Sequence, residues 1–463
     1  MQTSKEIPGM FEGRILPLLI KLTLPVLGGM AFQLLYNVVD TIWISRIDLN
    51  DPSYVGGTGI IFPILVLAIA MGNGFLVGTS SLVARAIGEK AESLFNKVTE
   101  SGIAVAVGTA AVFMTLFYLF DEQIVRLLGA EGDYFVHALE YFHYIIPATL
   151  VMFVGMVLLG IFQGEGQMDK VMKAMLISTI GNIILDPILI FLFDMGVSGA
   201  VLATTIAQFI AVLYCISLLI RKKSIIRLDW KLRNIRGSIA GQIVSIGFPQ
   251  AVGQATTAVS FLILNRIVIN IDRLALTAFT ICGKFEQIVL WPFFAMGSAL
   301  LTMAGQNAGR GNISRVRKIW NTSVLAALVF CLLLSTIMFL FARHIYPLFS
   351  DIPDVIEYAV TQTRVVIYSY VFAAIAVLAG FLFQSIGRPF PAFIVTMLRL
   401  FGLAVPVIYL CNYFFNWGMY GVWTGIIFGN TTGAAVALLW SRLTLKKLER
   451  GEIKVKRAGT ADG

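Results

Sequence analysis

The sequence has few charged residues for its length. Lys, Arg, Asp and Glu together make up 13% of its 463 residues, whereas hydrophobic residues make up 58%. Soluble globular domains carry about 25% charged residues, because charge covers their water-facing surface. This shortage of charge excludes an ordinary soluble protein and predicts that the apolar excess faces lipid.

Cysteine and histidine are also scarce. The four cysteines stand singly within apolar segments, the three histidines form no ligand pattern with them, and no CxxC spacing occurs. An isolated cysteine in an apolar segment is most often a small buried hydrophobic residue. We therefore expect no Cys/His metal centre and no cofactor.

Motifs of nucleotide and hydrolase chemistry are missing as well. The chain has no Walker A sequence, no GxSxG elbow and no HExxH pair. We therefore expect neither ATP-driven pumping by this chain nor an enzyme. The net charge of +9 predicts no nucleic-acid partner, because the basic residues flank apolar segments instead of forming one solvated patch.

Long apolar runs dominate what is present. A spanning helix needs about 20 mostly apolar residues, and segments of alternating hydrophobicity typical of a membrane β-barrel are absent. The first run is too long for a signal peptide, so we expect it to be retained. The pattern predicts an all-α polytopic membrane protein with twelve transmembrane helices, at about 15–45, 56–80, 98–120, 134–162, 170–193, 197–220, 240–270, 275–303, 319–341, 356–384, 390–414 and 418–441.

Basic residues are distributed unevenly between the two sets of loops that these spans define. One set, which includes both chain ends, holds 27 of the 35 Lys and Arg residues, and the opposite set holds only four. Positively charged loops stay in the cytoplasm. We therefore predict a multi-pass protein of the inner (cytoplasmic) membrane with both termini in the cytoplasm.

The two halves of the chain resemble each other at an offset of about 221–224 residues. Pro25 pairs with Pro249, and Gly78–Gly88 pairs with Ala299–Gly309. Six helices per copy is an even number, so the repeat is parallel, and we expect two pseudo-symmetric six-helix bundles around a central cleft. The predicted organisation is an N-terminal lobe at 1–225, a basic cytoplasmic linker at 226–239, and a C-terminal lobe with a basic tail at 240–463.

Two of the acids within predicted spans have a polar neighbour one turn away. Tyr36 precedes Asp40 by four residues, and Asn182 precedes Asp186 by four, so each pair shares a helix face. Ionisable groups inside a span are expensive and mark functional sites. Counted from the outer loops at ~1.5 Å per residue, both acids and Thr204 lie at similar depth, which predicts one polar cluster in the N-terminal lobe.

This cluster allows two interpretations. Two carboxylates in a poorly hydrated site do not both ionise cheaply, so the pair suits proton coupling. Alternatively, Asp40, Asn182, Asp186 and Thr204 hold a Na⁺ ion through their oxygen atoms. The sequence does not separate these uses. A non-functional interpretation, in which each acid is a carboxylate hydrated at a helix end, also stays open.

A third acid and several uncharged residues are candidates for lining the cleft. Lys284 and Glu286 stand two residues apart on the eighth span, so they do not face each other, and interhelical pairing is the alternative to a cleft position. We also expect Met30, Gln33 and Met175 to line the cleft. Pro25 interrupts the first span and is a candidate hinge, since proline removes a backbone hydrogen bond.

The order of these motifs resembles the multidrug and toxic compound extrusion (MATE) transporters over the whole chain. The signals are Pro25…Asp40, the run ending Ala84-Arg85-Ala86-Ile87-Gly88, Gln163…Gly166, and Asn182-Ile183-Ile184-Leu185-Asp186-Pro187. An acidic site in the N-terminal lobe, formed here by Asp40 and Asp186, resembles the DinF-like branch of this family. The resemblance implies an antiporter that exchanges H⁺ or Na⁺ for amphipathic, often cationic, organic compounds, with Asp40 as the principal coupling residue, Asp186 in support, and helix bending at Pro25. We expect the protein to be a monomer, although the sequence does not fix its oligomeric state. The alternative is a lipid-linked oligosaccharide flippase of the same superfamily, which Lys284 keeps open.

Overall fold

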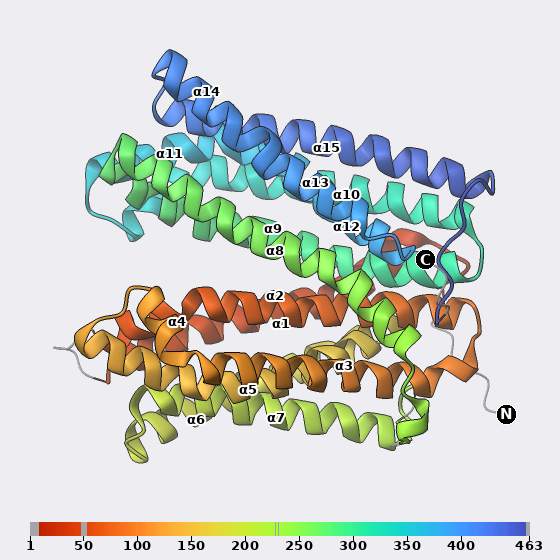
Figure 1. Cartoon of the computed structure of the whole chain (residues 1–463). Helices are drawn as coiled ribbons and strands as arrows, with labels where there is room; N and C mark the ends of the chain where they lie inside the picture. Colours follow the sequence, from red (N-terminus) through yellow and green to blue (C-terminus); the bar gives the residue numbers. More distant parts are fainter. Residues whose placement is uncertain (1–8, 48–52, 227, 230, 460–463) are drawn as a thin grey trace. The chain divides into compact units, whose positions relative to one another are not determined.

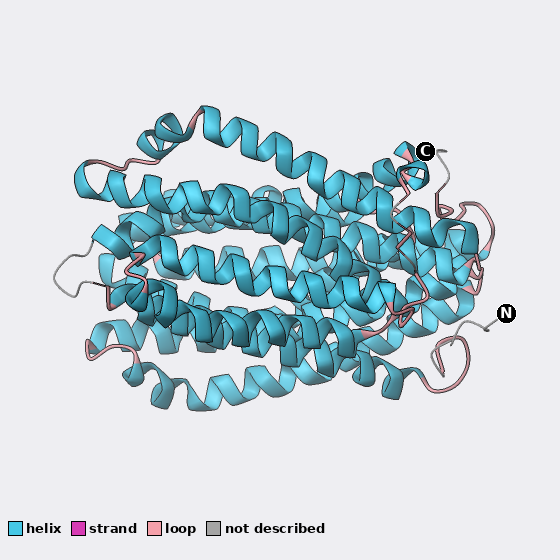
Figure 2. Cartoon of the chain, turned by 90° about the horizontal axis from the view of Figure 1, so that it is seen from below, coloured by secondary structure: helices cyan, strands magenta, loops and turns pink. Residues whose placement is uncertain are grey.

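The computed structural model describes residues 9–47, 53–226, 228–229 and 231–459, and all regular structure in these ranges is helical (Figure 2). Twelve helices of the described residues are long and apolar enough to cross a membrane, which confirms the predicted number. Helices are required there because lipid offers no hydrogen bonds to the backbone. The chain ends 1–8 and 460–463, named in the orientation prediction, lie outside the described residues.

The first repeat contributes six spans and one short helix (Figure 1). A helix of seven residues, α4, lies between the third and fourth spans, and π-helical turns (η1) extend the fifth. The elements are α1 (Ile15–Ser45), α2 (Ser53–Gly88), α3 (Glu92–Leu119), α4 (Asp121–Leu127), α5 (Gly132–Glu165), α6 (Met168–Pro187), η1 (Ile188–Leu192) and α7 (Gly196–Ile220).

The second repeat follows the short turn η2 (Leu232–Asn234) of the linker and contributes the other six spans. Its fourth and fifth spans are broken into shorter pieces by 3₁₀ and π turns. The elements are α8 (Gly237–Ile271), α9 (Arg273–Gly309), α10 (Ile313–Ile345), η3 (Tyr346–Leu348), α11 (Pro353–Val366), η4 (Ile367–Ser369), α12 (Tyr370–Ser385), α13 (Phe390–Met397), η5 (Leu398–Ala404), α14 (Val405–Phe415) and α15 (Met419–Glu449).

The described residues form two compact units that do not follow the repeat boundary. The N-terminal unit consists of Leu24–Ala251 and 457–459, and the C-terminal unit consists of 9–23 and Val252–Lys456. The helix α1 therefore begins within the C-terminal unit and enters the N-terminal unit at Leu24. Conversely, α8 begins within the N-terminal unit and leaves it after Ala251. In both helices the change of unit falls within two residues of the repeated proline.

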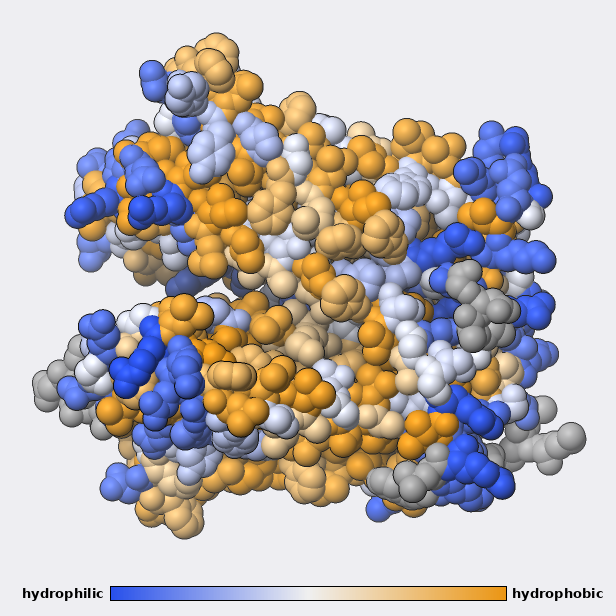
Figure 3. Space-filling view, viewed as in Figure 1, coloured by the Kyte–Doolittle hydropathy of each residue, from blue (hydrophilic) through white to orange (hydrophobic). Residues whose placement is uncertain are grey.

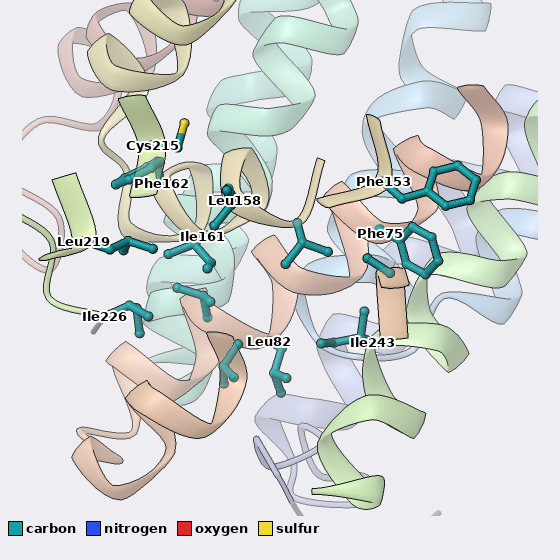
Figure 4. Close-up of a cluster of buried hydrophobic side chains, with 14 of the residues drawn as sticks. Phe75, Leu82, Phe153, Leu158, Ile161, Phe162, Cys215, Leu219, Ile226 and Ile243 are labelled. Atoms are coloured by element: carbon teal, nitrogen blue, oxygen red, sulfur yellow. The ribbon is translucent and has the colours of Figure 1, made fainter. Parts of the chain in front are cut away.

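A hydrophobic cluster holds the N-terminal unit together (Figure 4). Phe75 of α2 and Phe153 of α5 meet edge to face, with ring centroids 5.3 Å apart. Leu82 of α2 and Ile243 of α8 belong to the same cluster and have no exposed surface. The first half of α8 is thus part of the core of this unit.

Glycines allow α8 to pack against α2 with the two backbones in contact. A Cβ atom added to Gly74 would lie 2.8 Å from the carbonyl oxygen of Gly247, and one added to Gly78 would overlap the carbonyl of Ile243. Small residues spaced four apart commonly permit such close helix packing in membranes. The Gly74–Gly78 pair therefore fixes where α8 lies on the N-terminal unit.

Hydropathy changes along the helices, as expected for a membrane protein. In the space-filling view, hydrophobic residues cover the middle of the helices, and hydrophilic residues gather at their two ends (Figure 3). Within the helices, large apolar side chains such as Val112, Phe209 and Leu262 are exposed, at 49–63% of their surface. In water such exposure would be unfavourable, whereas lipid tails solvate it.

Candidate functional site

Three helices of the N-terminal unit bring the five residues of the predicted cluster together. The helix α1 carries Tyr36 and Asp40 one turn apart, and α6 carries Asn182 and Asp186 in the same spacing. Thr204 comes from α7, which packs against α6. Asn182 and Asp186 are buried, at 2% and 0% exposure.

Asn182 is the centre of the hydrogen bonding. Its Nδ2 atom donates to Asp186 Oδ1 at 3.0 Å and to Thr204 Oγ1 at 2.9 Å. The Thr204 hydroxyl in turn donates to the carbonyl oxygen of Ala200, one turn earlier in α7, at 3.1 Å. These bonds use both amide hydrogens of Asn182 and hold α6 and α7 in fixed register.

Tyr36 and Asp40 face this pair from α1. The hydroxyl of Tyr36 forms a hydrogen bond with Thr204. The carboxyl groups of Asp40 and Asp186 lie close enough to interact electrostatically. Tyr141 of α5 lies near both Asp40 and Tyr36. Sequence reasoning missed Tyr141, because nothing along α5 marks which of its tyrosines faces inward.

This cluster brings several unpaired acceptor oxygens together. Within the described residues, Asp40 Oδ1, Asn182 Oδ1 and Asp186 Oδ2 are buried and have no hydrogen-bond partner. A buried acceptor without a donor is costly, by ~1–3 kcal/mol, and buried polar atoms normally find a partner. Three such oxygens in one place fit a proton or a hard cation, since hard cations take oxygen ligands.

A pocket within the N-terminal unit lies next to the cluster. It is lined by Gln33 of α1, by residues between 151 and 159 of α5, 174–179 of α6, and 208–215 of α7. On three of these helices a lining residue lies one turn from a cluster residue: Gln33 from Tyr36, Thr179 from Asn182, and Gln208 from Thr204. The pocket and the cluster therefore adjoin along the same helix faces, with each carboxyl group two turns beyond the nearest lining residue of its own helix.

The other residues predicted to line the cleft lie in different places in the structure. Gln33 and Met175 both line the pocket, whereas Met30 of α1 is half-buried and does not. Lys284 of α9 is exposed within the C-terminal unit. Glu286, on the same helix, has polar partners inside that unit: Gln362 Nε2 donates to its Oε1 at 3.2 Å, and Tyr370 also hydrogen-bonds to it.

The chain matches a family model and two named relatives along most of its length. The MatE model matches residues 25–188 and 249–410. Multidrug export protein MepA of Staphylococcus aureus is 25% identical over 428 residues, which cover 90% of this chain and 91% of MepA. Probable multidrug resistance protein NorM of Thermotoga maritima is 24% identical, with 88% of each chain covered.

Solved structures agree with the fold over the whole chain. The MATE transporter ClbM, in complex with Rb⁺, is 32% identical with a TM-score of 0.86, and the match covers 96% of this chain and 99% of ClbM. A MOP superfamily transporter from Pyrococcus furiosus is 25% identical with a TM-score of 0.90, covering 97% of this chain and all of that one.

Proposed function

This chain belongs to the MatE family, and from that premise we propose that it is a secondary active antiporter, which exports amphipathic organic compounds in exchange for H⁺ or Na⁺. Family membership makes it a multi-pass membrane transporter, not an enzyme, coupled to an ion gradient and needing no cofactor. The relatives are described as multidrug export and resistance proteins, so the flippase alternative is not favoured.

The coupling ion binds at the cluster around Asn182. The observation that carries this proposal is the group of three buried acceptor oxygens without a donor. Asp40 is the principal coupling residue and Asp186 supports it, while Asn182, Tyr36 and Thr204 orient the carboxyl groups. A proton satisfies the site by turning one acceptor into a donor. Na⁺ satisfies it by binding to oxygen atoms of Asp40, Asn182, Asp186 and Thr204.

The position of Pro25 allows the helix α1 to bend. This proline lies where α1 passes from one compact unit into the other, and its missing N–H removes a helical hydrogen bond at that point. We propose that α1 bends at Pro25 when the charge on Asp40 changes, which transmits ion binding to the adjoining pocket. Pro249 has the corresponding position in α8.

The cellular setting is part of the proposal. We propose an inner-membrane protein with both termini in the cytoplasm, which acts as a monomer. We also propose that the N-terminal lobe spans 1–225 and the C-terminal lobe spans 240–463, and that the basic linker at 226–239 joins them. The uneven distribution of Lys and Arg among the loops supports the cytoplasmic position of the termini.

Transport in vesicles tests the coupling. Purified protein would be reconstituted and driven by an imposed pH gradient or an imposed Na⁺ gradient, with wild type compared with Asp40→Asn. We expect the variant to lose gradient-driven export, and the gradient that drives the wild type identifies the ion. Asp169→Asn is the control, because Asp169 is exposed at the start of α6.

Two results would count against the proposal. If Asp40→Asn exports against a gradient as well as the wild type does, Asp40 is not the coupling residue. If the protein binds lipid pyrophosphates and no drug-like compound, the flippase alternative replaces the antiporter.

A further inference from the structure

The pocket beside the coupling cluster contains no charged and no aromatic side chain. Its lining consists of aliphatic residues and methionines, with two glutamines, two hydroxyl groups and the thiol of Cys215 as its polar groups. Lipophilic cations without hydrogen-bond donors are usually held by aromatic faces or by carboxylates. Neither group lines this pocket.

Two amides in the lining are available to a ligand. Gln33 extends from α1 and Gln208 from α7, and within the described part of the chain neither side chain is engaged in a hydrogen bond. Each amide offers two N–H donors and one carbonyl acceptor. A site built from such groups discriminates strongly in favour of ligands that complete its hydrogen bonds.

The carboxyl groups of the cluster do not supply the missing charge. Asp186 has no exposed surface and already accepts a hydrogen bond from Asn182. Asp40 lies two turns beyond Gln33 on α1 and is not among the lining residues. A ligand held between the four helices therefore meets amides and hydroxyls first, while the acids two turns away remain available for the coupling ion.

Methionine makes the apolar part of the pocket adaptable. Met152, Met156 and Met175 contribute three flexible, polarisable side chains to the lining, and methionine fits irregular ligand shapes better than branched residues do. The pocket therefore discriminates only weakly between ligands of different shape, and hydrogen bonding supplies most of its selectivity.

We propose that this pocket binds uncharged amphiphiles that carry amide, carbonyl or hydroxyl groups, and that Gln33 and Gln208 recognise those groups. The inference rests on the proposed export function and names the substrate class of the same site. It assigns separate tasks to neighbouring groups: the amides bind the exported compound, and the carboxyl groups bind the coupling ion. Positive charge on the compound is not a requirement.

Equilibrium binding to the full chain in lipid nanodiscs tests the inference with two radiolabelled probes. Chloramphenicol is uncharged and carries an amide and two hydroxyls, whereas tetraphenylphosphonium is a lipophilic cation without a hydrogen-bonding group. We expect the wild type to bind chloramphenicol more tightly. Gln33→Leu and Gln208→Leu should each weaken chloramphenicol binding by about five- to tenfold, the effect of one lost hydrogen bond, and leave tetraphenylphosphonium binding unchanged.

Two further variants keep the test decisive. Gln208→Glu places a carboxylate in the pocket and should strengthen tetraphenylphosphonium binding about tenfold, a gain that a misfolded protein does not show. Gln123→Leu, the same exchange at an exposed residue of α4 outside the pocket, should change neither affinity by more than twofold. The inference is overturned if wild type prefers the cation, or if both Gln→Leu variants weaken the two probes equally.

Failure of the proposed function looks different. Asp40→Asn should lose gradient-driven export while still preferring chloramphenicol to tetraphenylphosphonium, because Gln33 and Gln208 are unchanged. If binding follows the expected pattern but no ion gradient drives export by the wild type, the antiport proposal fails and the substrate class stands. If export is gradient-driven but Gln33 and Gln208 do not affect chloramphenicol selectivity, only the substrate class fails.

Discussion

Asn182 and Asp186 are joined by a hydrogen bond of 3.0 Å across one turn of α6, and the second carboxylate oxygen of Asp186 is buried without a partner. The same amide also donates to Thr204, so it has no hydrogen left for the second oxygen. The site is thus incomplete in its hydrogen bonding where the proposed function requires a cation.

Asp186→Asn should stabilise the protein while impairing coupling. The new side chain is a neutral amide in place of a buried ionisable carboxyl group with an unpaired oxygen, and this relieves a desolvation penalty of ~1–3 kcal/mol. We expect a higher unfolding temperature and at least tenfold slower gradient-driven export. Thermal unfolding in detergent and vesicle transport measure the two effects. Asn182→Ala is the comparison and should lower the unfolding temperature, because it leaves Asp186 Oδ1 without its donor. Equal destabilisation by both changes would contradict this account.

Gly247→Ala should weaken the packing of α8 against α2. The added Cβ would overlap the backbone of Gly74, and overpacking of this kind costs about 1–3 kcal/mol. Gly59→Ala in α2 is the matched control, because a Cβ there meets no atom within 4 Å. The control should be neutral or slightly stabilising, since alanine favours helix. Fluorescence-detected size-exclusion chromatography after heating compares the unfolding temperatures of the two variants. Equal temperatures would refute the close contact between α8 and α2.

Asp272 should contribute stability that disappears in acid. It caps the N-terminus of α9, accepting from the Leu274 backbone N–H at 2.7 Å and from the Tyr358 hydroxyl at 2.9 Å. The backbone N–H of Leu274, more than the Tyr358 hydroxyl, lowers the pKa of the Asp272 carboxyl group. The unfolded state therefore binds the proton more readily, so the contribution is present at neutral pH and is lost as pH falls through the depressed pKa.

Substitution of Asp272 tests this contribution to stability. Asp272→Ala should cost about 1 kcal/mol at pH 7, seen as a lower unfolding temperature, whereas Asp272→Asn keeps an acceptor oxygen and should cost less. The difference between wild type and Asp272→Ala should narrow below about pH 4, near the ordinary Asp pKa of about 3.9. A difference that is constant from pH 7 to pH 3 would show that the carboxylate charge is irrelevant.

Deletion of residues 457–463 should destabilise the N-terminal unit. The backbone N–H of Ala458 donates to both oxygens of Glu89, at 3.1 and 3.4 Å, and Gly459 N–H donates to Gln242 at 3.1 Å. Ala458 is 5% exposed and belongs to the hydrophobic cluster of this unit. We expect the unfolding temperature to fall by several degrees. Deletion of 460–463 alone is the control, and an equal effect of both deletions would contradict a role for Ala458 and Gly459.

Much of the architecture follows from residue order alone. Twelve apolar runs required twelve helices, because lipid satisfies no backbone hydrogen bonds. Helical periodicity placed Tyr36 beside Asp40 and Asn182 beside Asp186 before any tertiary information. The predicted spans agree with the helices to within a few residues at most ends. The helices α2, α9 and α15 continue six to eight residues beyond their predicted ends, because a helix does not have to stop where its apolar run stops.

The pocket was only partly foreseeable. Gln33 and Met175 were named as cleft residues, whereas Gln208 was not, although it lies one turn from Thr204 on α7. An uncharged polar residue in a span gives a weaker signal than an acid does, because its burial is less expensive. Nothing in the local sequence shows which face of α5 or α7 borders an empty space.

By itself, the sequence determined what the bilayer enforces: the number and length of the helices, and which polar residues share a helix face. Tertiary structure alone decided that α8 enters the core of the N-terminal unit, that Tyr141 lies near Asp40, and that the residues around Ala458 return to Glu89. These contacts join residues far apart in the chain. They depend on the close fit of particular side chains and glycines, which hydropathy and helical periodicity do not encode.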